Sequence, residues 1–216
     1  MTVLEAGPGD AAAARLDDQV AFLLEADRLK HVVRRSTIAD GSRRENSAEH
    51  SWHLALFAAV LAEHAAEPVD VARVIRMLLI HDVVEIDAGD TFAYDSAARV
   101  SKETREQGAA DRLFALLPDD QAAEWRALWD EFEAGRSPDA RFAAAIDRLQ
   151  PILLNHASGG VAWREHGIRA GQVRARNRHT HQAAPALWDH AQNVIDAAVA
   201  EGHLAPDDGN AGSRGR

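Results

Sequence analysis

The stretch LLIHDVVEIDAGD, residues 78–90, places charged side chains inside an apolar helix. Upstream, apolar residues recur at the three- and four-residue spacing of one helix face, at Val71, Val74, Ile75, Leu78 and Leu79. The adjacent His81 and Asp82 therefore belong to a helix that is already committed to the core. Burying an unpaired carboxylate costs several kcal/mol, so this pair needs a partner or a metal ion.

More acidic residues follow within a few positions. Glu85 comes one helical turn after the pair, Gly89 supplies a turn or helix stop, and Asp90 stands just beyond it. Four ionisable side chains are thus expected near one helix end.

Composition limits the classes of partner. The 216 residues include 24 Lys and Arg against 34 Asp and Glu, a net charge of −10, which disfavours binding to nucleic-acid backbones or anionic membranes. A small soluble ligand fits better. With no cysteine, any metal must be held by histidine and carboxylates, and a reducing cytoplasm is favoured. No apolar stretch reaches the length of a membrane span or resembles a secretory leader, so we predict a soluble cytoplasmic protein.

The apolar pattern has the helical period almost throughout, without alternating stretches or an Asp-Gly hairpin between β-branched runs. The chain is predicted to be all-α, one domain over residues 15–204, with disordered tails at 1–14 and 205–216. Helices are expected at 17–33, from an Asn46 cap to before Pro68, through His81, and at 101–117, 120–134 and 185–200. Another starts at Ser137-Pro138 and should kink or end at Pro151.

Some side-chain positions follow from this helix pattern. The first helix is expected to turn Val20, Leu23, Leu24 and Leu29 inward. Residues 101–134 carry more large apolar groups than two outer helices need, which predicts a homodimer through Leu113, Phe114, Trp125, Trp129 and Phe132.

Candidate metal ligands come from three predicted helices. His50 opens one helix, His81 and Asp82 lie on the next, and Asp147 sits among apolar residues of a later one. Two imidazoles and two carboxylates suit a divalent ion that keeps positions open for water and substrate. The alternative is that the His-Asp pair is only a hydrogen-bonded pair in the core.

The order H…HD…D resembles the HD-domain metal-dependent phosphohydrolases, and HDVVEIDAGD at 81–90 is similar to the branch that contains the bacterial 5′-deoxynucleotidases. Supporting segments are RLKHVVR at 28–34, ENSAEHSWH at 45–53 and AIDRLQPILLN at 145–155. The resemblance covers residues 20–204 and implies a helical HD domain.

The resemblance also implies roles for particular residues. Glu85 and Asp90 match the family's acidic catalytic residues, and Arg34 matches the arginine that contacts the phosphate. Arg35 stands where the enterobacterial type has a tryptophan near sugar and base, so the sugar preference stays open. The metal ligands would be His50, His81, Asp82 and Asp147.

A single ion is predicted, because dinuclear HD proteins have further histidines between the HD pair and the final aspartate, and this chain has none between Asp82 and Asp147. Manganese, cobalt, magnesium, iron and zinc are the candidates.

The predicted activity is release of phosphate from a nucleoside 5′-monophosphate or a similar small ester. Glu85 would orient or deprotonate the attacking water, and Asp90 would protonate the leaving oxygen or help to hold the nucleophile. The alternatives are hydrolysis of a nucleoside triphosphate and a nucleotide sensor without turnover. Retention of both acids favours an enzyme over a sensor.

Overall fold

The computed structural model describes residues 8–90 and 102–207. Its helices are α1 Pro8–Ala26, α2 Ser47–Leu61, α3 Val71–Ile80, α4 Glu85–Ala88, α5 Lys102–Phe114, α6 Asp119–Ala134, α7 Pro138–Ala157, α8 Val161–Glu165, α9 Ala170–Asn177, α10 Thr180–Ala183 and α11 Pro185–Ala200. Two 3₁₀ turns, Asp27–His31 and Ala62–His64, and the strands β1 Val33–Thr37 and β2 Arg44–Asn46 complete the described elements. The expected all-α class is confirmed, with one small sheet added.

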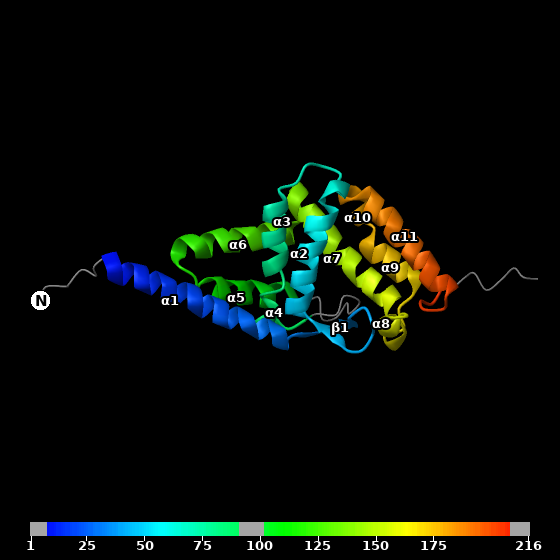
Figure 1. Cartoon of the computed structure of the whole chain (residues 1–216), viewed down its shortest axis with the longest axis horizontal. Coiled ribbons are helices and arrows are strands. Elements are labelled where there is room, and N and C mark those ends of the chain that lie inside the picture. The colour runs from blue at the N-terminus through cyan, green and yellow to red at the C-terminus, as the bar shows by residue number, and fades with distance from the viewer. Residues whose placement is uncertain (1–7, 91–101, 208–216) are drawn as a thin grey trace, which may run out of the picture.

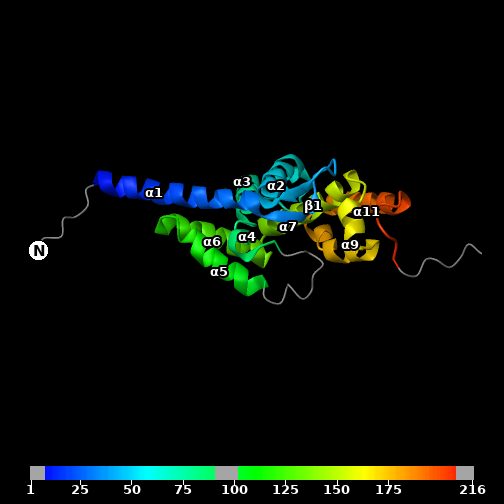
Figure 2. The ribbon, with the colours of Figure 1, turned by 90° about the horizontal axis from the view of Figure 1, so that it is seen from below.

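Helix α7 runs through the middle of the molecule, and the other elements are arranged around it (Figure 1). α2 and α3 pack on each other and on α7, while α5 and α6 lie on one side and α9, α10 and α11 on the other (Figures 1 and 2). The buried apolar residues form one cluster that these helices share. Among the described residues, no helix combines the length and apolar character that crossing a membrane requires.

Local sequence determines several helix ends as predicted. Asn46 caps α2 by accepting from Glu49 N at 2.9 Å, and the Glu49 side chain returns to Asn46 N at 3.3 Å. Ser137 caps α7 in the same way, and Pro138 occupies its first turn. Gly135 ends α6 with a φ of 60°. The last helix has the expected bounds.

The region between α1 and α2 contains the hairpin that the sequence analysis missed. β1 and β2 are antiparallel, with an irregular register between the pairs Val33–Asn46 and Thr37–Arg44. The chain reverses at Asp40-Gly41, where Gly41 has a φ of 70°. The strands escaped detection because they are short and their buried residues, Thr37 and Glu45, are polar while Val33 is exposed.

Helix α1 differs from the prediction in both its extent and its orientation. It begins at Pro8, so residues 8–14 are helical and not disordered, as an alanine-rich segment allows; residues 1–7 lie outside the described residues. Phe22 and Leu29 face the core as buried residues, whereas Leu23 and Leu24 are 65% and 69% exposed. Only Leu29 was assigned correctly, because α1 extends beyond the body and one narrow face touches it (Figure 1).

Two further expectations are corrected. Of the two outcomes expected at Pro151, a kink or an end, the end is wrong, because α7 continues to Ala157. Large apolar groups at 101–134 are also not surplus surface: Leu113, Phe114 and Trp129 are buried, and Trp125 and Phe132 pack against the same core. These residues therefore provide no argument for a dimer.

Of the predicted C-terminal tail, residues 205–207 are placed and Ala205 pairs with Arg169, while 208–216 lie outside the described residues.

A tight backbone contact joins the start of α8 to the end of the described chain. A Cβ on Gly160 would lie 2.0 Å from the carbonyl oxygen of His203, and Gly160 has a φ of 75°. Gly135 has a similar φ of 60° with open space around it. Gly160→Ala and Gly135→Ala should therefore share the cost of a left-handed alanine, about 1 kcal/mol, and differ in the clash.

We predict that Gly160→Ala lowers the free energy of unfolding by at least about 2 kcal/mol more than Gly135→Ala does. Urea denaturation of the two variants beside the wild-type protein measures the difference. Equal losses of unfolding free energy in the two variants would show that the segments around Gly160 and His203 can move apart without destabilising the protein.

Candidate metal centre

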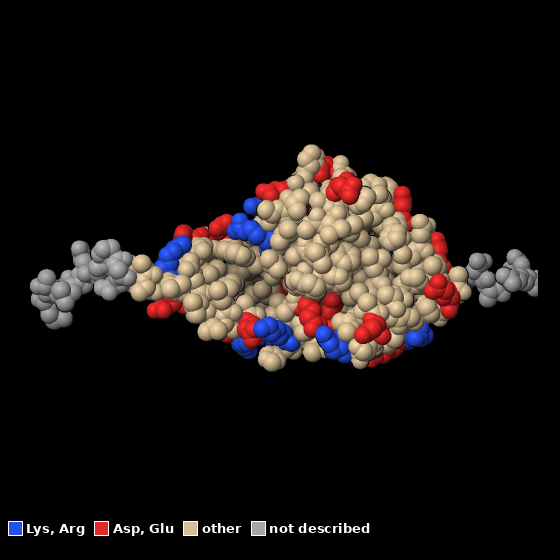
Figure 3. Space-filling view, in the orientation of Figure 1, with Lys and Arg blue, Asp and Glu red and all other residues tan. Residues whose placement is uncertain are grey.

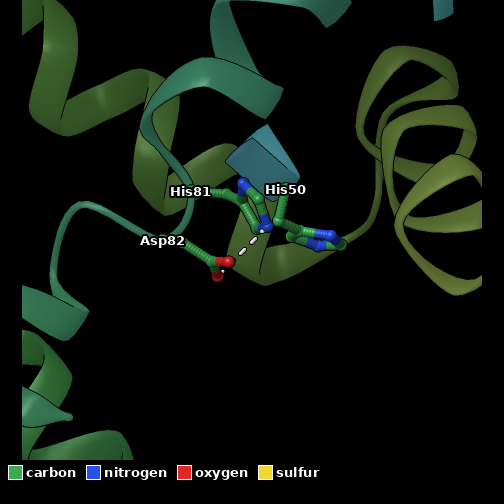
Figure 4. Close-up of side chains that lie close together, drawn as sticks. All are labelled: His50, His81 and Asp82. Atoms are coloured by element: carbon green, nitrogen blue, oxygen red, sulfur yellow. Dashed lines mark ion pairs between the residues drawn. The ribbon is translucent and has the colours of Figure 1, made fainter. Parts of the chain in front are cut away.

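Three helices bring the predicted ligands together. His50 lies in the first turn of α2, His81 caps the C-terminus of α3 with Asp82 directly after it, and Asp147 lies in α7. Figure 4 shows His50, His81 and Asp82 around one point. His81 Nε2 lies 3.1 Å from Asp82 Oδ1, and Asp147 Oδ1 lies 3.0 Å from His50 Nε2 and 3.8 Å from His81 Nε2.

The orientation of His81 is determined by its surroundings. Its Nδ1 lies 2.8 Å from the carbonyl of Leu78, which can only accept, so Nδ1 carries the proton and Nε2 presents a lone pair. Phe132 packs against the ring, with centroids 5.0 Å apart, and Trp129 Nε1 donates to the His81 carbonyl at 3.2 Å. The two aromatic groups of α6 thus hold a ligand that α3 supplies.

His50 is fully buried between two carboxylates. Its Nε2 faces Asp147, and its Nδ1 lies 3.4 Å from Glu45 Oε2. Burial and Arg34 lower the pKa of His50, but Asp147 and Glu45 outweigh them and raise it to about 9. Burial raises the pKa of Asp147, yet the hydrogen bond from His50 holds it well below its usual range.

Glu45 belongs to this network and was not singled out from the sequence, although it stands in the segment ENSAEHSWH. It is buried, and Gln150 Nε2 donates to its Oε1 at 2.8 Å. The same Gln150 nitrogen lies 3.2 Å from His53 Nδ1. A buried carboxylate behind a ligand imidazole is the usual device that orients a metal-binding histidine.

The donor set fits a divalent ion. His81 Nε2 is buried and has no hydrogen-bond partner among the described residues, although two carboxylate oxygens lie within 3.8 Å of it. A lone pair that faces carboxylates is unfavourable unless a cation lies between them. Two imidazole nitrogens with Asp82 and Asp147 are the mixed N and O ligands that borderline divalent ions accept.

The remaining predicted residues line a cavity beside these ligands. Arg34 Nη1 donates to Asp82 Oδ2 at 2.7 Å, and Ser47 Oγ donates to Glu85 Oε2 at 2.7 Å. Burial raises the pKa of Glu85 well above its usual range, and Asp82 adds to this effect, because a second negative charge nearby is unfavourable. Burial likewise raises the pKa of Asp90.

Distant segments supply the other walls of this cavity. Several of the lining residues are basic, and those that the sequence did not connect with the site are Lys102, Arg148 and Arg176, together with His166. Other lining residues are apolar and include Ile152, Ala162, Trp163 and Ile168. No pattern in the sequence marks these positions, because they meet only through the packing of α5, α7, α8 and α9. Trp163 is both buried and part of the wall, whereas Trp52 is exposed and lies outside it.

Comparison with known proteins places this arrangement among relatives. A family model described as an HD domain matches residues 26–188. The 5′-deoxynucleotidase HDDC2 of Bos taurus is 32% identical over 133 residues, or 61% of this chain and 63% of that protein. The Homo sapiens protein of the same name is 30% identical, over 61% of this chain and 64% of its own length. The chain thus spans less than two thirds of either relative.

Solved structures agree with the fold. A predicted metal-dependent phosphohydrolase from Magnetospirillum magnetotacticum MS-1 is 52% identical, with a TM-score of 0.85 over 89% of this chain and 96% of that one. The PH0347 protein of Pyrococcus horikoshii OT3 has a TM-score of 0.57 at 18% identity, over 84% of this chain and 99% of its own, and shows the shared fold alone.

The role of Glu45 can be tested by metal binding. Glu45→Gln keeps the shape and loses the charge that faces His50 Nδ1, so we expect the affinity for Mn²⁺ to fall about 10- to 100-fold. Glu124→Gln is the control, since Glu124 pairs with Arg76 on the surface. Isothermal titration of the metal-stripped variants measures the change, and equal affinities would mean that Glu45 does not orient the ligand.

Proposed function

The chain belongs to the HD-domain family, and from the chemistry of its site we propose that it is a metal-dependent phosphohydrolase that releases phosphate from a nucleoside 5′-monophosphate or a similar small phosphate ester. The observation that carries the proposal is that one cavity beside the candidate ligands is lined both by basic residues and by apolar residues that include Trp163. The basic residues suit a phosphate and the apolar residues a nucleobase or sugar.

We assign the metal to His50, His81, Asp82 and Asp147, as one divalent ion. When bound there, such an ion supplies Lewis acidity and a water of lowered pKa. The identity of the ion is part of the proposal, with manganese, cobalt, magnesium, iron and zinc as candidates. Arg34 is assigned to the phosphate, because its guanidinium lines the cavity and lies against Asp82.

The two cavity acids divide the proton transfers in this proposal. Ser47 occupies Oε2 of Glu85, which fixes that carboxyl and leaves Oε1 for the attacking water. Asp90, beyond the left-handed Gly89, is assigned to protonate the leaving oxygen. Raised pKa values suit both tasks, since an acid or base works best when its pKa is near the operating pH.

Relatives named 5′-deoxynucleotidases support a nucleotide substrate. Arg35 also lines the cavity, so the sugar preference stays undecided between ribose and deoxyribose. A cytoplasmic location and the lack of nucleic-acid binding remain predictions from composition.

Self-association also remains a proposal, but the surface that would mediate it now lies on α1 and not at residues 101–134. Leu16, Val20, Leu23 and Leu24 form an exposed stripe at helical spacing along α1. α1 and α2 lie on the face that Figure 3 shows, where charged side chains gather toward the edges. We propose a second copy as the occupant, because a two-fold axis brings the same stripe against itself and buries both copies.

The assignment of the two acids predicts a dependence on the leaving group. Asp90→Asn should lose about 10²- to 10⁴-fold in kcat on a nucleoside 5′-monophosphate and far less on p-nitrophenyl phosphate, whose leaving group departs without a proton. Glu85→Gln should lose similar factors on both esters. Asp87→Asn is the control, because Asp87 pairs with Arg112 outside the cavity.

Metal content of each variant should stay near that of the wild-type protein. Equal losses by Asp90→Asn on both esters would contradict its role as the acid. Tripolyphosphate released from a nucleoside triphosphate, with no phosphate from a monophosphate, would overturn the proposed substrate class.

The dimer proposal predicts that Leu24→Glu converts a dimer to a monomer at micromolar concentration, because the new charge would be buried between the copies. Ala21→Glu adds the same charge on α1 outside the stripe and should leave the dimer intact. Light scattering gives the masses, and a monomeric wild-type protein would refute the proposal.

A further inference from the structure

A second group of metal-binding side chains lies where α7 and α11 end. His156 is in the last turn of α7, and Glu201 and His203 follow α11. Glu201 Oε2 is 3.0 Å from His156 Nε2 and 3.2 Å from His203 Nδ1, and one ligand atom from each residue lies within 4.8 Å of the others. His156 is nine residues beyond Asp147, about 14 Å along the helix, so this group is separate from the first centre.

We propose that His156, Glu201 and His203 bind a divalent transition-metal ion of the zinc class. Zinc binds histidine nitrogen and carboxylate oxygen at about 2.0–2.2 Å, which separates neighbouring ligand atoms in a tetrahedral shell by about 3.3–3.6 Å. The two nitrogen–oxygen separations are already close to that value. Two imidazoles favour zinc over magnesium or calcium, which prefer oxygen.

Simple hydrogen bonding accounts for only half of this group. His156 Nε2 has hydrogen-bond geometry to Glu201, whereas His203 Nδ1 is buried and has no hydrogen-bond partner among the described residues despite lying 3.2 Å from the same oxygen. A cation beside that oxygen would satisfy this nitrogen.

The backbone holds the ligands in place without an ion. Gly202, with a φ of 76°, turns the chain between Glu201 and His203, and His203 N donates to Ala198 O at 2.8 Å. The close approach of Gly160 holds the His203 backbone against the start of α8. Because this part of the backbone is already ordered, metal binding costs little conformational entropy, which favours affinity.

The bound ion would stabilise one wall of the first cavity. Asn155, next to His156, lines that cavity, as do Ala162 and Trp163 just after Gly160. An ion that links the end of α7 to the residues after α11 therefore fixes the segment between these wall residues. Its role is structural, and it does not depend on which ester the first centre hydrolyses.

The test isolates the second group by removing the first. Metal-stripped protein with both His81→Ala and Asp82→Ala, which leaves only His50 and Asp147 of the first centre, is titrated with Zn²⁺, alone and combined with His203→Ala, Glu201→Gln or His181→Ala. Glu201→Gln changes a half-exposed side chain and preserves its shape, so misfolding cannot mimic its effect. His181 is an exposed histidine outside both clusters and serves as the control.

We expect one tightly bound Zn²⁺ per chain in the His81→Ala, Asp82→Ala protein and in its His181→Ala combination, and at least about tenfold weaker binding with His203→Ala or Glu201→Gln. Zn²⁺ should raise the melting temperature of the first two proteins alone. Equal affinity and equal melting shifts in all four proteins would overturn the proposal and leave the group as a surface hydrogen-bond contact.

Discussion

The centre of this fold depends on one constraint: several electron-pair donors face one another in a buried space and need positive charge between them. His81 Nε2 and the carboxylates of Asp82 and Asp147 meet in a buried space, and each would repel the others without positive charge among them. Arg34 and a proton on His50 supply that charge in the metal-free protein, since Arg34 contacts Asp82 and the pKa of His50 is about 9. A divalent ion can replace the proton, because metal binding requires the neutral imidazole.

The sequence predicted the parts of this arrangement that follow from local rules. The Asn46 cap, the Ser137-Pro138 start and the Gly135 stop depend on neighbouring residues alone, and each was identified correctly. Asp147 was singled out as a lone carboxylate on an apolar face, which is rare enough to be noticed without a structure.

The missed features depend on contacts between distant segments. Glu45 was passed over because a glutamate next to a helix cap is usually solvated, and only the approach of Gln150 shows that it is buried. Leu23 and Leu24 look like core residues by period, yet whether an apolar face meets the core depends on where the rest of the chain lies. Pro151 should disturb its helix, but the helix continues, because removing one N–H leaves only the carbonyl of Asp147 without its usual partner.

The charge distribution connects the fold to a small anionic ligand. The protein carries a net charge of −10, yet five of its 24 basic residues line the one cavity beside the metal ligands: Arg34, Arg35, Lys102, Arg148 and Arg176. Concentrated in a cleft with low-dielectric walls, they attract a small anion by focusing the field, whereas the acidic exterior repels a long polyanion. A phosphate ester short enough to enter therefore gains the attraction without the repulsion. This selection by size and charge operates before any contact with the base, so a cavity that also contains four carboxylates can still select a phosphate.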